Sequence, residues 1–253
     1  MGGDSFQMSK FFINRDNVSG DRVLITGEDV KHIRSVLRME PGDILTVCDG
    51  DGKDYLARIA KMDSQAVTAD IVEVKECGTE PPIEVVLYQG LPKSDKMELI
   101  IQKSVELGVK RIVPVITERT VVKLHSKDDA ANKIGRWQKI ALEAAKQCNR
   151  GMIPNIGFPL DFKTAVDMAG RAQLSIIPYE KEETSSLKNL LKNCINTVSV
   201  MIGPEGGFSE EEIDFAKRSG VIPVTLGPRI LRTETAGLAV LSILMYQMGD
   251  MGG

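Results

Sequence analysis

Beyond residue 83, short apolar runs alternate with helical patterns, and this alternation constrains the fold more than any other feature of the 253-residue chain. The runs typical of buried strands are IEVVLYQ (83–89), RIVPVIT (111–117), LSIIPY (174–179), TVSVMIG (197–203) and VIPVTLG (221–227). Helical patterns lie at 94–108 (with Ser94 as the expected N-cap and Gly108 as the stop), 129–148, 184–193 and 209–219, and an apolar helix begins near 234. Such α/β alternation favours a parallel sheet covered on both faces, with ligands beyond the carboxyl ends of its strands.

The first part of the chain has the alternating pattern of half-buried strands instead. The expected strands are 22–26, 43–49, 55–60 and 66–74. One helix near 29–39 interrupts them, with Val30, Ile33, Val36 and Leu37 on one side. DGDGKD (49–54) predicts a hairpin turn rather than a calcium loop, because Asp54 and Ala60 occupy the places of the required glycine and glutamate. We therefore expect a small β-barrel-like domain over 1–75, a linker over 76–82 and an α/β domain over 83–253.

Composition and cysteine usage narrow the class of protein. The chain is 42% hydrophobic and 26% charged with a formal net charge of −3, which is typical of a soluble globular protein and disfavours a general nucleic-acid coat. Its four cysteines have no CxxC spacing and it has two histidines, so we predict reduced thiols, a cytoplasmic location and no metal site. The apolar run 236–248 is shorter than the roughly 20 residues of a membrane span, so no membrane association is expected.

The stretch IGPEGGFSEEEID (202–214) resembles a phosphate-binding loop but carries the wrong charge. It lacks the lysine of a Walker loop, and its glycines do not fit a dinucleotide fingerprint. Ser209 is a good N-cap, and the glutamates at 210–212 fill the first helical turn, where they would repel a phosphate. The loop suits a neutral or cationic ligand, although a plain strand-to-helix turn with capping acids remains open on this segment alone.

A second segment, LGPRILRTETAG (226–237), places charged residues between a strand and an apolar helix. Arg229, Arg232 and Glu234 lie where unpaired charge is unfavourable, so they are expected to be either paired or functional. An ion pair between Arg232 and Glu234 is the structural alternative.

Together these two segments resemble the C-terminal signature of the RsmE family, the 16S ribosomal RNA (uracil-N3)-methyltransferases of the SPOUT class. FFINRD and HIRSVLRMEPGD are similar to that family's small N-terminal PUA-like β-barrel domain. QGLPKSDKMELIIQKSVELGV and RWQKIALEAAKQCNRGMIP are similar to the start of its methyltransferase domain. The resemblance implies a trefoil-knotted C-terminal α/β domain, a homodimer, S-adenosylmethionine as cofactor and a uridine of small-subunit 16S rRNA, rather than DNA, as substrate.

The resemblance also implies the site residues. The cofactor would lie between two walls, formed by Ile202, Gly203, Pro204, Glu205, Gly206 and Gly207 on one side and by Leu226, Gly227, Ile230, Leu231, Arg232 and Thr235 on the other. Its sulfonium is a cation, which agrees with an acidic loop. Methylation of uracil N3 requires loss of the imide proton, so Arg232 is the candidate to hold charge on a uracil oxygen. Glu234 or Glu205 is the candidate proton acceptor, and a capping role for Glu234 stays open.

Basic residues gather between Arg119 and Arg150 and along the N-terminal helix. The spacing of Lys31, Arg34 and Arg38 predicts one shared helix face. The candidate RNA-binding residues are Lys31, Arg34, Arg38, Lys93, Arg136, Lys139 and Arg150. Three alternatives remain: a solvated basic face without RNA, a SPOUT enzyme of other specificity such as ribose 2′-O methylation, and a non-catalytic RNA-binding assembly factor.

Overall fold

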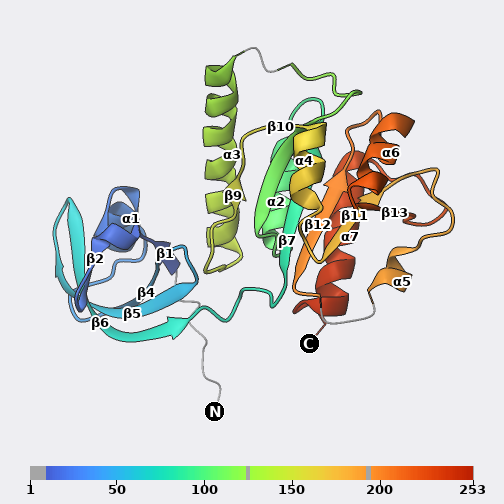
Figure 1. The fold of residues 1–253 in the computed structure, drawn as a ribbon. Coiled ribbons are helices and arrows are strands. Elements are labelled where there is room, and N and C mark those ends of the chain that lie inside the picture. Colours follow the sequence, from blue (N-terminus) through green and yellow to red (C-terminus); the bar gives the residue numbers. More distant parts are fainter. Residues whose placement is uncertain (1–9, 124–125, 192–194, 253) are drawn as a thin grey trace. The chain divides into compact units, whose positions relative to one another are not determined.

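The computed structural model describes residues 10–123, 126–191 and 195–252, which form two compact units (Figure 1). The first unit contains the chain up to Glu80 together with Ala145–Ile153, and the second contains Pro81–Ala144 and the chain from Pro154 onward. The predicted first domain ended at residue 75, whereas its last strand runs to Glu76. The return of Ala145–Ile153 to the first unit had no counterpart in the sequence prediction.

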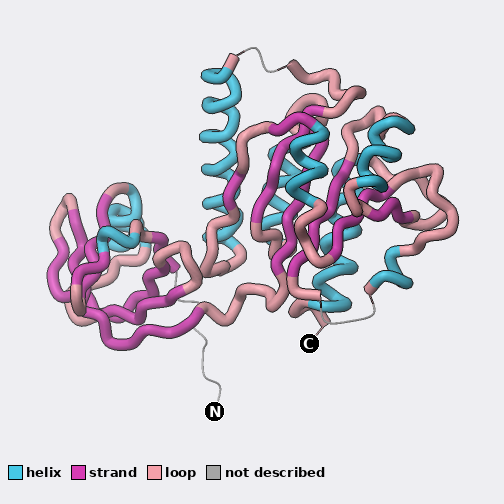
Figure 2. The backbone as a smooth tube through the Cα atoms, viewed as in Figure 1, coloured by secondary structure: helices cyan, strands magenta, loops and turns pink. Residues whose placement is uncertain are grey.

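The first unit is built on a six-stranded sheet (Figure 2). Its strand order is β1 (Lys10–Phe12), β4 (Ile44–Cys48), β5 (Lys53–Met62), β6 (Ala66–Glu76), β3 (Arg22–Thr26) and β2 (Val18–Ser19), with a 3₁₀ turn at Arg15–Asn17. All neighbours are antiparallel except β1 and β4. The predicted hairpin at 49–54 is confirmed, because Gly50 and Gly52 adopt φ values of 78° and 97° between β4 and β5.

The helix of this unit departs from its prediction. α1 (Glu28–Lys31) continues as a π-helical turn, η2 (His32–Val36). Val30 and Ile33 are buried as expected, but Val36 is 65% exposed and Leu37 38% exposed. The wider π turn rotates later residues out of the apolar side, and the helix then ends. Arg38 follows it with φ of 54°, so the prediction that Lys31, Arg34 and Arg38 share one helix face is wrong.

The second unit contains the predicted parallel sheet. Its strands lie in the order β10 (Leu160–Asp161), β8 (Arg111–Ile116), β7 (Glu84–Gly90), β12 (Thr197–Ile202), β11 (Leu174–Pro178) and β13 (Ile222–Val224), while β9 (Asn155–Ile156) also pairs with β8. Every pairing is parallel. Because neighbouring carboxyl ends share one edge, the segments that follow β11, β12 and β13 come together there.

Helices cover both faces of this sheet, as predicted. The helices that follow the first unit are α2 (Lys96–Glu106), α3 (Lys127–Gln147), α4 (Phe162–Ala169), α5 (Leu187–Leu190), α6 (Glu210–Arg218) and α7 (Thr233–Met248). α4 and α6 pack on one face through a core that includes Tyr88 and Met201. α7 packs on α2, β7 and β12 from the other face, with Leu241 and Leu244 fully buried (Figure 1).

Parts of the helix prediction need correction. The helix expected at 184–193 is α5, which covers only Leu187–Leu190, and residues 192–193 lie outside the described part of the chain. The N-cap of α2 is Asp95 rather than Ser94, because Ser94 has a positive φ of 56° and belongs to the preceding turn. α4 was missed, although Asp161 caps it and its apolar residues have helical spacing. No helix in the described part of the chain is both long and apolar enough to cross a membrane. The trefoil knot stays a prediction.

Candidate functional site

A pocket of about 890 Å³ opens at the carboxyl edge of the second sheet, a size typical of small-molecule sites. Its walls are the loop after β12, the loop after β13 and the segment Pro178–Glu183 after β11. The predicted cofactor-binding residues that line it are Ile202, Gly203, Pro204, Glu205, Gly206, Gly207, Leu226, Gly227, Ile230, Leu231 and Arg232. Thr235 and Glu234 are not among the lining residues. The structure thus brings the two predicted walls together, while their binding roles stay predictions.

Glycines allow the loop after β12 to lie against the sheet. A Cβ on Gly90, the last residue of β7, would be 2.6 Å from both the Cδ and the nitrogen of Pro204. Gly207 has a φ of 66°, a backbone conformation that other residues rarely adopt. The backbone itself therefore forms this wall of the pocket.

A buried hydrogen-bond chain fixes the two walls to each other. Thr233, the first residue of α7, donates from Oγ1 to the carbonyl of Gly203 at 2.5 Å. Gln89 Nε2 donates to Thr233 Oγ1 at 2.9 Å and to the carbonyl of Gly90 at 3.0 Å. Both side chains are buried, so the chain is shielded from water. Sequence reasoning missed Gln89 and Thr233, although both stand inside the segments that carry the family resemblance, because their partners lie 144 and 30 residues away along the chain.

The segment that follows β8 contacts both the pocket loop and the first turn of α6. Glu212 forms a capping box with Ser209 and also accepts a hydrogen bond from the backbone N–H of Glu118 at 2.9 Å. The guanidinium of Arg119 donates to the carbonyl of Gly206 at 2.9 Å. These two contacts hold the segment that follows β8 against the pocket loop and the start of α6. The side chain of Arg119 is used in the contact with the loop.

Lys96 connects the two acidic candidates. Its ammonium lies 3.1 Å from Glu205 Oε1 and 3.1 Å from Glu234 Oε2. Glu205 also accepts from the backbone N–H of Lys93 at 3.1 and 3.3 Å. The carboxylate of Glu234 is thus paired with Lys96, which differs from the Arg232 pairing considered above. Lys96 lines the pocket and was missed by sequence reasoning.

Both carboxyl groups favour their ionised form. Partial burial acts to raise the pKa of Glu205, but hydrogen bonds from its own N–H and from Lys96 outweigh it, so the pKa is lowered. The pKa of Glu234 is lowered mainly by a hydrogen bond from its own N–H, with help from Lys96 and from the charge of Arg232. The two carboxylates in turn raise the pKa of Lys96.

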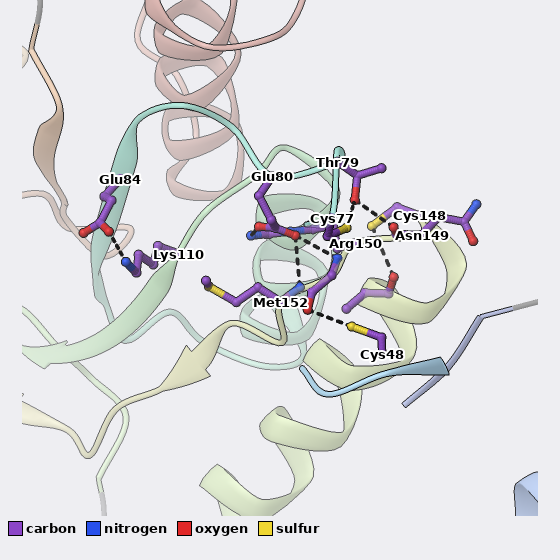
Figure 3. A network of polar contacts seen from close by, with 12 residues as sticks. Cys48, Cys77, Thr79, Glu80, Glu84, Lys110, Cys148, Asn149, Arg150 and Met152 are labelled. Carbon is purple, nitrogen blue, oxygen red and sulfur yellow. Dashed lines mark hydrogen bonds and ion pairs between the residues drawn. The ribbon is translucent and has the colours of Figure 1, made fainter. Parts of the chain in front are cut away.

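Of the candidate RNA-binding residues, Arg150 is buried rather than exposed at the surface. It is only 4% exposed, and its guanidinium donates to Glu80 Oε2 at 2.6 Å (Figure 3). Glu80 also accepts from the backbone N–H groups of Gly151 and Met152 at 2.9 and 3.0 Å. A guanidinium enclosed in this way stabilises the first unit and does not face solvent, which argues against the predicted contact of Arg150 with RNA; that contact stays an untested prediction.

The other basic candidates lie at the surface. Lys31, Arg34, Arg38, Lys93 and Lys139 are exposed. Arg136 is exposed as well and pairs with Glu98 at 2.6 Å. Their contact with RNA stays a prediction.

Comparison with known families identifies the chain. Residues 79–245 match the model of an RNA methyltransferase domain, and residues 25–72 match an RNA methyltransferase PUA domain. The ribosomal RNA small subunit methyltransferase E of Bacillus subtilis is 37% identical over 88% of this chain and 89% of its own length. The chain belongs to the ribosomal RNA small subunit methyltransferase E family. The protein of that name from Aquifex aeolicus is 33% identical over 89% of this chain and 95% of its own.

Solved structures agree with this family membership. A methyltransferase from Legionella pneumophila, in complex with bound S-adenosylmethionine, superposes with a TM-score of 0.83 at 36% identity, over 97% of this chain and 100% of that one. The family's enzyme from Neisseria gonorrhoeae, bound to S-adenosyl methionine, also gives 0.83, at 33% identity and over 96% and 99% of the two chains. The fold expected from the sequence, a PUA-like sheet domain and a parallel-sheet methyltransferase domain, is confirmed.

Proposed function

We propose that this protein transfers the methyl group of S-adenosylmethionine to N3 of a uridine in small-subunit ribosomal RNA, in the cytoplasm. The observation that carries the proposal is the pocket, because its two walls are the segments that carry the family resemblance. The relatives named above support the cofactor and the class of RNA.

The residues of the pocket fit the cofactor chemically. When bound, S-adenosylmethionine supplies an electrophilic methyl group on a positively charged sulfur. Gly203, Gly206 and Gly207 line one wall without side chains to cover its backbone, where N–H and C=O groups suit an adenosine moiety. Glu205 contributes a negative charge to the same wall, which favours a cationic ligand.

Two side chains are assigned to the reaction itself, and a third is assigned to the positioning of the site. Arg232 lines the pocket as the N-cap of α7 and stabilises negative charge on a uracil oxygen while N3 loses its proton. Glu205 lines the pocket as a carboxylate, so it is the better placed of the two acids to accept that proton. Glu234 holds Lys96 from the α7 side and orients the site.

The test compares methyl transfer with cofactor binding in the same variants. Glu205→Gln and Arg232→Ala are expected to slow methyl transfer about a hundredfold or more, because each removes a group that acts in the transition state. Cofactor binding, measured by calorimetry, is expected to fall much less. Arg218→Ala, at the exposed end of α6, is the control and keeps wild-type rates. Wild-type transfer in both test variants would contradict the assigned roles.

The substrate is tested with labelled cofactor on small-subunit particles and on naked RNA, followed by mapping of the methylated atom. Label at N3 of a single uridine supports the proposal, and label on a ribose oxygen replaces it with 2′-O specificity. If the cofactor binds neither alone nor with RNA, the protein acts as a non-catalytic RNA-binding factor.

A homodimer is part of the proposal. α2 and α7 pack together and present Leu99, Ile243 and Tyr246, which are 45%, 43% and 72% exposed. An apolar group on adjacent helices suits a second copy of the chain. Light scattering of the purified protein measures the mass, and a monomer at micromolar concentration would contradict this part.

A further inference from the structure

Lys96 occupies an unfavourable place for a lysine unless it has partners. It is the first residue of α2, where the positive end of the helix dipole disfavours a cation. Its side chain is only 30% exposed, although an unpaired ammonium would extend into water. Two carboxylates at 3.1 Å account for this position. The residue is therefore placed by its contacts rather than by helix formation.

The two contacts reach different parts of the pocket. Glu205 belongs to the loop after β12, and Glu234 belongs to the first turn of α7. Lys96 and Glu205 line the pocket, whereas Glu234 does not. One ammonium thus joins the start of α2, the pocket loop and the last helix, and Glu234 fixes that ammonium from outside the pocket.

We propose that Lys96 is a positioning residue of this site, whose ammonium holds the carboxylates of Glu205 and Glu234 in the arrangement that receives the cofactor and the target base. Because the ligands are taken to be S-adenosylmethionine and a uridine, the inference rests on the proposed function. The two carboxylates and the ammonium form one ion-paired trio. Its ordering by ion pairs means that little rearrangement is needed when a ligand binds.

The arrangement has a consequence for pH. The charged groups that act on the carboxylates are Lys96 of α2, which faces both, and Arg232 before α7, which acts on Glu234. Both carboxyl pKa values are lowered in the folded chain, so the stabilisation is present at neutral pH and is lost as the pH falls through those values. Without Lys96 the values rise, and the loss begins at a higher pH. An opposite charge at this distance moves a carboxyl pKa by about one unit or more.

The experiment titrates the side-chain carboxyl carbons of Glu205 and Glu234 by NMR in the ligand-free full-length protein. Glu205→Gln and Glu234→Gln assign the two signals. Lys96→Met is expected to raise both titration midpoints by about one pH unit. Lys96→Arg is expected to keep them low, since the charge is retained. Lys103→Met, which removes a lysine of the same helix that pairs with its neighbour Glu106, is expected to change neither.

Calorimetry gives the second readout. In Lys96→Met the acid limit of S-adenosylmethionine binding should move to higher pH by the same interval, with Lys96→Arg close to wild type. Unchanged carboxyl titrations in Lys96→Met, or titrations in Lys96→Arg that match those of Lys96→Met, would overturn the inference. Failure of the wild-type protein to bind the cofactor would overturn the proposed function instead, because the NMR titration needs no ligand.

Discussion

Gly90 shows how much of the pocket depends on a single missing side chain. It ends β7, and the loop after β12 passes so close that a Cβ there would overlap Pro204, at 2.6 Å from two of its atoms, and would lie 2.9 Å from the carbonyl carbon of Gly203. Two of these three contacts are with backbone, and the third is with a rigid ring. The surroundings therefore cannot adapt by a rotamer change.

Gly90→Ala is accordingly expected to lower the free energy of unfolding by about 1–3 kcal/mol and to weaken cofactor binding. Gly135→Ala is the matched control. Gly135 lies inside α3 with nothing within 4 Å of an added Cβ, so alanine there should raise stability by about 0.5–1 kcal/mol. Urea unfolding and calorimetry of the two variants provide the measurement. Equal stability of both variants would show that the loop moves away freely.

The sequence predicted the residues of local motifs but not those that act through distant contacts. The two pocket walls were predicted, because each follows an apolar run and carries its glycines and charges within a dozen residues. Lys96, Gln89 and Thr233 were missed, since each acts through partners far away in the chain. Arg150 was assigned to RNA because charge alone does not reveal burial, and its partner Glu80 stands in a segment expected to be a linker.

At the scale of elements, α6 links the pocket loop to the rest of the sheet. From the sequence, its three first-turn glutamates are expected to share one role, stabilisation of the helix start. In the structure they differ: Glu210 pairs with Lys181, Glu211 is exposed, and Glu212 is buried with hydrogen bonds from Ser209 and Glu118. Element positions were predicted well where apolar periodicity was long. β9 and β10 were missed because each has only two residues, and α4 was missed although its eight residues have an N-cap and helical spacing.

Glu212→Ala is expected to lower the free energy of unfolding by about 1–3 kcal/mol, since it removes half of the capping box and leaves the N–H of Glu118 without its acceptor. Glu211→Ala, one position earlier and exposed, should stay within about 0.5 kcal/mol of wild type. Denaturant unfolding of both variants gives the comparison. If the two losses are equal, the contact with Glu118 contributes no stability.

At the scale of the whole molecule, the chain enters the second unit after Glu80, returns to the first at Ala145–Ile153, and leaves it again. The returning segment is held by the Arg150–Glu80 pair and by further contacts within the first unit. Cys48 Sγ donates to the carbonyl of Gly151 at 3.0 Å, and Thr79 Oγ1 donates to that of Asn149 at 2.8 Å (Figure 3). Periodicity along the sequence cannot reveal such a return, because the segment is irregular and these partners lie 70 to 103 residues away.

Substitutions of Arg150 and Lys139 are therefore expected to have different effects, the first on stability and the second on RNA binding. Arg150→Ala leaves the carboxylate of Glu80 without its cation, which for a buried pair lowers the free energy of unfolding by about 3 kcal/mol. Lys139→Ala, at an exposed position, should leave stability within about 0.5 kcal/mol. If Lys139 contacts a phosphate, its loss weakens RNA binding and reduces the slope of log affinity against log salt by about 0.7–0.9. Urea unfolding and RNA titrations across a salt series measure both effects, and a stable Arg150→Ala with a reduced salt slope would restore Arg150 to the RNA-binding surface.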